Sequence, residues 1–172
     1  GDQLAAEGVS VHVLGRRPGF HPSLAGSLRR AALSTGSTVV HSHQYSPFVY
    51  AALARVVAPS LRVVFTEHGR LSDAPPSRKR QLVNPLLARA GNRLFSVSHD
   101  LKRHMIEEGL PASRIEVIHN GIDIGVEPID VETRARRRSE IGVASDTCLL
   151  VAVARLDPVK GLNVTIVTTA KN

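Results

Sequence analysis

The chain has 172 residues, a formal net charge of +7 and 42% hydrophobic residues, values typical of a globular domain with a core of its own. They exclude a wholly disordered chain, and the single cysteine, Cys148, excludes a disulfide framework and favours a cytoplasmic setting. No apolar run approaches the roughly 20 residues of a membrane-spanning helix, and no signal peptide is visible.

The charge comes mostly from arginine and favours an anionic partner. Aromatic residues make up only 3% of the chain, so nucleic-acid binding through base stacking is poorly supported. The densest basic run includes Arg134 and Arg136 to Arg138, and we interpret it as a solvated helix face.

Short β-type runs alternate with helical patterns along the whole chain. The first residues look like the end of a helix closed by Gly8, so we expect a fragment of a longer protein. Ser98 is the expected N-cap of one helix. In chain order, we predict a strand at 9–14, a helix at 22–33, a strand at 38–41, a helix at 47–58, a strand at 61–66, a helix at 78–90, a strand at 93–97, a helix ending at 109, a strand at 115–118, a helix at 131–141, a strand at 147–154 and a helix from 161.

This alternation predicts an α/β fold, a Rossmann-like parallel sheet with helices on both faces. The loop at 119–128 is rich in turn residues and is the expected boundary between domains. We expect a partial N-terminal domain at 1–118, a connection at 119–143 and the first βα unit of a second domain at 144–172. A lone βα unit cannot bury both faces of its strand.

Polar residues at the carboxyl ends of strands matter most, because parallel sheets bind ligands there. His41 and His43 are two apart on a strand, so their side chains point the same way; they are at most half of a metal site. The segment 66–70 brings Glu67, His68 and Arg70 around a glycine turn, where a histidine can donate to a substrate hydroxyl. The alternative is a turn that is simply rich in polar residues.

Two later turns offer anion-binding features. Backbone N–H groups after Ser98 open a helix, although plain capping is the commoner explanation. Arg155 and Lys160 flank a strand-to-helix turn and suit a diphosphate, the alternative being a surface loop with solvated charges.

Together these segments resemble the group-1 glycosyltransferases, the retaining GT-B enzymes of family 4 that use nucleotide-sugar donors. The matching stretches are 38–43, 66–70, 97–102, 117–123 and 154–161. The resemblance covers nearly the whole chain and implies part of a GT-B fold, in which the N-terminal domain takes the acceptor and the C-terminal domain takes the donor.

The resemblance also implies roles for single residues. Arg155 and Lys160 would hold the donor diphosphate, and His68 would reach the donor sugar near the reacting centre. His43 and Arg70 would line the acceptor side. Asn120, Gly121 and Asp123 would belong to the segment that connects the two domains.

The family generally needs no catalytic metal or cofactor. The implied partners are a nucleotide sugar and a glycan or lipid-linked acceptor of polysaccharide or cell-envelope synthesis, at the cytoplasmic face of the membrane. No nucleic acid is expected. Peripheral membrane contact would involve Arg16, Arg17, Arg78, Lys79 and Arg80.

The chain does not contain the family's first strand, its glycine-rich loop or its paired glutamates. We therefore expect that the 172 residues alone do not transfer sugar. The alternative function is a non-catalytic basic Rossmann-like module that binds anions. A dehydrogenase is disfavoured because no G-x-G-x-x-G follows a predicted strand.

Overall fold

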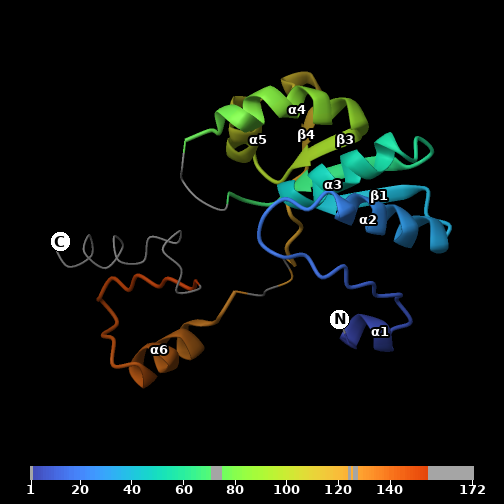
Figure 1. Cartoon of the computed structure of the whole chain (residues 1–172). Helices are drawn as coiled ribbons and strands as arrows, with labels where there is room; N and C mark the ends of the chain where they lie inside the picture. The colour runs from blue at the N-terminus through green and yellow to red at the C-terminus, as the bar shows by residue number, and fades with distance from the viewer. Residues whose placement is uncertain (1, 71–74, 124, 126–127, 155–172) are drawn as a thin grey trace. The chain divides into compact units, whose positions relative to one another are not determined.

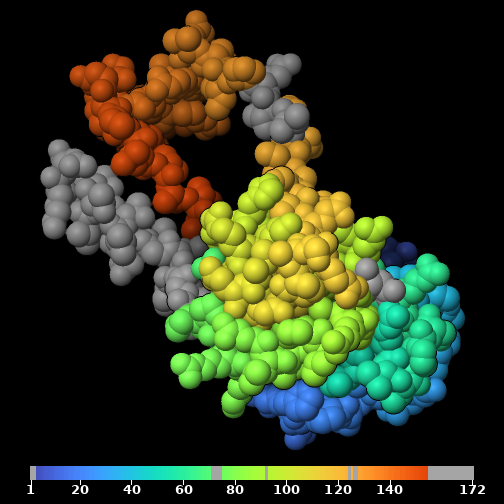
Figure 2. Space-filling model, turned by 90° about the horizontal axis from the view of Figure 1, so that it is seen from above, coloured from blue at the N-terminus to red at the C-terminus, as the bar shows by residue number. Residues whose placement is uncertain are grey.

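The computed structural model describes residues 2–70, 75–123, 125 and 128–154 (Figure 1). They fall into two compact units, one made of residues 2–70 and 75–120 and the other beginning at residue 121. In Figure 2 the blue, green and yellow segments of the first unit lie against one another in one packed body. The helices are α1 (Asp2–Ala6), α2 (Ser23–Ser34), α3 (Tyr45–Val56), α4 (Arg78–Ala90), α5 (His99–Glu107) and α6 (Val131–Glu140), with a 3₁₀ turn at Ala112–Arg114.

The first unit is built on a parallel sheet of four strands in the order β1-β2-β3-β4. The strands are β1 (Val39–His43), β2 (Arg62–Glu67), β3 (Gly91–Ser96) and β4 (Ile115–Val117). Each successive strand is joined to the next by one helix, α3, α4 or α5. The predicted class, a Rossmann-like α/β fold with helices around a parallel sheet, is therefore confirmed, and the three crossover helices between β1 and β4 lie on one face of that sheet.

The three crossover helices bury one face of the sheet. Right-handed crossovers that advance one strand at a time in the same direction place their helices on the same side. Phe48 of α3, Leu87 of α4 and Met105 of α5 accordingly share one core cluster with Phe65 of β2. The rings of Phe48 and Phe65 stack with centroids 4.4 Å apart.

The other face of the sheet is more open in the described part of the chain. His41 pairs in register with Val64, and His43 pairs with Thr66. The two histidines are exposed, and Val64 and Thr66 are half-buried. The carboxyl ends of β1 and β2 thus present a polar, accessible surface opposite the core.

Local sequence signals account for several helix ends. The hydroxyl of Ser98 accepts a hydrogen bond from the Leu101 N–H at 3.1 Å, so the predicted N-cap of α5 is confirmed. Gly8, predicted to close the first helix, has a φ of 80°. The predicted helix at residues 78–90 matches α4.

Two predicted strands are wrong. Residues 9–14 form no strand, and Val13 is 88% exposed. Residues 147–154 form none either, and Val153 is 95% exposed. A strand is held by hydrogen bonds to a neighbouring strand, and within the described residues neither segment has such a neighbour. The predicted helix from residue 161 lies outside the described residues.

The interpretation of the arginine run as a solvated face holds for Arg136 and Arg137 of α6, which are exposed beside Glu140. It is wrong for Arg138, which is buried and donates hydrogen bonds to the carbonyls of Ala144 and Thr147. This arginine fixes the chain that follows α6 against the helix.

Candidate functional site

The candidate site lies where β1 and β2 end, on the open face of the sheet. The centroids of the His41 and His43 rings are 4.2 Å apart, so the prediction that the two side chains point the same way is confirmed. His41 Nε2 lies 2.8 Å from the hydroxyl oxygen of Thr66 on the neighbouring strand. Partial burial lowers the pKa of His41, and the nearby His43 and His68 lower it further.

His68 follows the last residue of β2 and meets His43 across the two strand ends. His43 Nδ1 lies 2.8 Å from His68 Nε2, a hydrogen-bonding distance, and both rings are accessible. The structure therefore brings together two residues that the sequence placed on different strands.

The backbone between His43 and α3 is strained. Gln44 has a φ of 76° and a ψ of 155°, a conformation that is essentially limited to glycine. Its N–H nevertheless donates to the Thr66 carbonyl at 2.9 Å, which extends the pairing of β1 with β2 past His43. Such strain of about 1–3 kcal/mol is commonest at functional sites.

Glu67 lies directly before His68 but points to the buried face. It is 8% exposed, and its Oε1 has no hydrogen-bond partner among the described residues. Burial raises its pKa to about 7, against the lowering effect of the His68 and Gly69 amides and of Arg80. Near neutral pH this carboxyl exchanges a proton beside the site.

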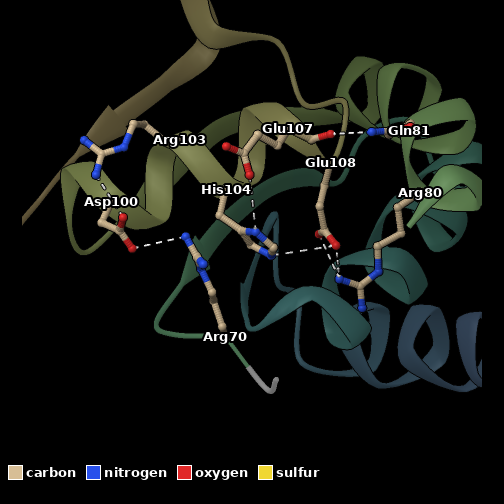
Figure 3. Close-up of polar contacts among 8 residues, drawn as sticks. All are labelled: Arg70, Arg80, Gln81, Asp100, Arg103, His104, Glu107 and Glu108. Atoms are coloured by element: carbon tan, nitrogen blue, oxygen red, sulfur yellow. Dashed lines mark hydrogen bonds and ion pairs between the residues drawn. The ribbon is translucent and has the colours of Figure 1, made fainter. Parts of the chain in front are cut away.

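Arg70 leaves the strand end in another direction and contacts α5 (Figure 3). Its guanidinium donates to Asp100 at 3.2 Å, and Arg103 donates to the same carboxylate at 2.9 Å. The ion pair is partly exposed and holds Arg70 beside the start of α5. The predicted role of Arg70 on the acceptor side stays a prediction.

A second polar network joins α4 to the end of α5 (Figure 3). One Arg80 nitrogen lies 2.8 Å from both carboxylate oxygens of Glu108, and the guanidinium stacks 4.1 Å from the centre of the Tyr45 ring. His104 lies between Glu107 and Glu108, and Gln81 donates to the Glu107 carbonyl at 2.9 Å. These contacts fix the helices behind the site.

An apolar groove of 390 Å³ runs beside β1. Leu24, Leu28 and Val40 supply apolar lining, and His41 and His43 border it. The groove places an apolar surface next to the histidine pair, within the first unit.

Of the remaining predicted site residues, three lie in the described part of the chain and two do not. Asn120, Gly121 and Asp123 lie exposed in a stretch without regular structure, and the chain passes from the first unit to the second between Asn120 and Gly121. Arg155 and Lys160 lie outside the described residues. Within the described ranges, no group of three or more His, Cys, Asp or Glu side chains is arranged to hold a metal.

Sequence reasoning missed Asp100, because only the folded chain reveals it as the partner of Arg70. It expected Glu67 to gather with His68 and Arg70 around the turn. Glu67 instead continues the alternation of Val63 and Phe65 and so lies on the buried face.

A parallel sheet with crossover helices on one face and polar residues at its carboxyl ends defines a Rossmann-like α/β domain. The chain belongs to Glycosyltransferase Family 4, whose family model matches residues 2–126. The resemblance drawn from the motifs is thereby confirmed.

Several solved structures are similar to the chain. Alr3699/HepE of Anabaena, solved with UDP and glucose, is 21% identical with a TM-score of 0.72, over 99% of this chain and 47% of that one. The same protein, solved with UDP-glucose, matches with the same identity and TM-score, over 99% of this chain and 46% of that one. A glycosyltransferase of Rickettsia africae is 17% identical with a TM-score of 0.63, over 99% of this chain and 46% of that one.

At these identities the likeness shows a shared fold. The chain spans about half the length of the solved structures that it matches. Comparison with curated protein sequences gives no significant match. Among the described residues, no helix combines the length and apolarity needed to cross a bilayer.

Proposed function

We propose that the chain is part of a glycosyltransferase that moves a sugar from a nucleotide-sugar donor to a glycan or lipid-linked acceptor. Family membership carries the proposal. It is supported by HepE, whose structures contain UDP and glucose or UDP-glucose, and by the polar strand ends around His68. The cellular role we propose is polysaccharide or cell-envelope synthesis on the cytoplasmic side of the membrane.

In this proposal His68 contacts the donor sugar near the bond that breaks. It lies at the accessible carboxyl end of β2, where parallel sheets bind ligands. Arg155 and Lys160 hold the donor diphosphate and neutralise the charge that grows on it as the glycosidic bond breaks. Because these two cations would neutralise that negative charge, the proposed reaction needs no bound metal or other cofactor.

The acceptor is proposed to lie against the first unit. His43 borders the apolar groove beside β1, which suits an acceptor with an apolar part. Arg70 lies on the other side of the strand end, where it pairs with Asp100. Asn120, Gly121 and Asp123 form the passage toward the donor-binding part of the protein.

The test uses the complete gene product with UDP-glucose and a lipid-linked glycan acceptor. We expect His68→Ala to lower kcat by on the order of 10²–10³-fold, because a group that contacts the reacting centre is lost. The matched control, His12→Ala, removes an exposed histidine and should leave kcat unchanged. Equal activity of the two variants would contradict the role of His68.

Binding of UDP separates this proposal from the alternative anion-binding module. We expect saturable binding that weakens in Arg155→Ala and Lys160→Ala, and unchanged turnover in EDTA. A basic module would instead bind polyanions without nucleoside preference, with an affinity that falls steeply as salt rises.

Membrane contact is proposed through the basic residues Arg16, Arg17, Arg78 and Lys79. Arg80 is left out because Glu108 and Tyr45 already engage it. Charge reversal of the four residues should abolish partitioning to anionic vesicles at low salt. Unchanged partitioning would contradict the proposed contact.

A further inference from the structure

The contact between His43 and His68 restricts the chemistry of both rings. With 2.8 Å between His43 Nδ1 and His68 Nε2, one nitrogen carries a proton and the other accepts it. Whichever ring donates, Nε2 of His68 is occupied by His43. The nitrogen that His68 can offer to another molecule is therefore Nδ1.

The two rings differ in how firmly the fold holds them. His43 ends β1, pairs in register with Thr66 and is followed by the strained Gln44, whose N–H bonds to the Thr66 carbonyl. His41 adds a ring 4.2 Å away that is itself held by the Thr66 hydroxyl. His68 lies just beyond β2, where within the described residues no strand pairs with its backbone, although its amide bonds to the Glu67 side chain. His43 is thus the fixed partner.

We propose that His43 is a positioning residue for His68: it holds the imidazole of His68 in one orientation and selects Nδ1 as the nitrogen that faces the substrate. This inference rests on the proposed function and changes the role of His43, which resemblance alone assigned to the acceptor side. A fixed ring orientation matters because a displacement of about 1 Å at a reacting centre can lower the rate by on the order of 100-fold.

Two substitutions of His43 distinguish the positioning role from an effect of side-chain size alone. In His43→Asn the side-chain amide reaches the position of the lost Nδ1 and can donate or accept there. In His43→Gln the amide reaches the position of Nε2, which faces away from His68. The matched control, His41→Asn, removes a neighbouring imidazole that makes no hydrogen bond to His68.

The first readout is two-bond ¹H–¹⁵N correlation NMR of the histidine rings in the full chain. We expect the Nε2 resonance of His68 to show the shift of a hydrogen-bonded nitrogen in the wild type, in His43→Asn and in His41→Asn. In His43→Gln that resonance should move toward the shift of an imidazole nitrogen in water. A water-exposed Nε2 shift in the wild type, or an unchanged shift in His43→Gln, would overturn the inference.

The second readout is the steady-state kinetics of the complete gene product. We expect His43→Gln to lower kcat by on the order of 10–100-fold with little change in the KM for the acceptor, and His43→Asn to restore most of it. A rise in the acceptor KM with unchanged kcat in both variants would instead place His43 on the acceptor and overturn the positioning role. Absence of transfer by the wild type would overturn the proposed function, while the NMR result would still decide whether His43 orients His68.

Discussion

Two kinds of apolar run occur in this chain, and they fold differently. Val63 and Phe65 of β2 are completely buried, whereas Val151 and Val153 are 73% and 95% exposed. Both runs are rich in β-branched residues, so propensity predicts strands for both. The difference is that β2 has a neighbour on each side and crossover helices above it, and the run at residues 147–154 has no strand partner among the described residues.

The comparison shows that a strand is a property of the sheet. Hydrogen bonds to neighbouring strands and burial under helices stabilise a strand. Both come from other elements of the fold, so the sequence of an apolar run cannot provide them. The same reasoning applies to residues 9–14, where Val13 is 88% exposed. A substitution at Phe65 probes this difference directly. Smaller effects are expected at Gly109, Glu67 and Gln44, which probe how the elements around the sheet are held.

Phe65→Ala should destabilise the protein by about 3–5 kcal/mol, because it leaves a cavity under Phe48 in the core. Val13→Ala is the matched control and should change the free energy of unfolding by less than about 0.5 kcal/mol, because that side chain is exposed. Urea denaturation followed by circular dichroism measures both. Comparable losses would mean that residues 9–14 are packed in solution.

Gly109→Ala should cost about 2–4 kcal/mol. Gly109 has a φ of 92°, and an added Cβ would lie 2.8 Å from Cα and O of Gln81, whose carbonyl lacks a helical N–H because residue 85 is proline. Gly142→Ala is the control, since its φ is 70° but nothing lies within 4 Å of its Cβ. That variant should lose only about 1 kcal/mol through backbone strain. The difference in the free energy lost by the two variants, obtained from their denaturation midpoints, measures how closely Gly109 approaches the backbone of α4. Equal losses would contradict that close approach.

The buried carboxyl of Glu67 should make the free energy of unfolding depend on pH. Its pKa is raised from 4.5 to about 7 in the folded chain, so the folded state binds more protons between these pH values. The wild type should therefore lose stability relative to Glu67→Gln as pH rises from 4.5 to 7, by on the order of 2–3 kcal/mol, and level off above 7. Comparing the two proteins removes the contribution of His41, whose lowered pKa acts in the opposite direction. A difference that does not vary with pH would show that Glu67 is solvated.

Gln44→Gly should stabilise the protein by about 1 kcal/mol. Glycine adopts the φ of 76° without strain, which outweighs the entropy that it loses on folding. Gln44→Ala keeps the Cβ and should give no gain. Thermal unfolding of the three proteins measures the effect, and a destabilised glycine variant would mean that the Gln44 side chain contributes more than its backbone costs.

Much of the first unit was predictable because its signals are local. The Ser98 cap, the helix at residues 78–90 and the periodicity of β2 each depend on neighbours within a few residues in sequence. The family followed from short motifs at strand ends, and the matching family model confirms it. The direction shared by His41 and His43 followed from strand geometry alone.

The candidate site was less predictable because its contacts join distant parts of the chain. His43 and His68 are 25 residues apart, and Arg70 and Asp100 are 30 apart. No local rule specifies such pairs, since they depend on the register of β1 against β2 and on where α5 begins. Arg138 was misjudged for a similar reason: its burial depends on the carbonyls of residues that follow α6.

The amino-acid sequence by itself determined the alternation of strands and helices, the caps, the family and the placing of histidines at two strand ends. Only the tertiary structure decided which apolar runs become strands and which histidine nitrogens meet. The physical reason is that periodicity and capping act within one or two turns of chain, whereas sheet pairing, burial and a 2.8 Å contact require elements that are distant in sequence to be adjacent in space.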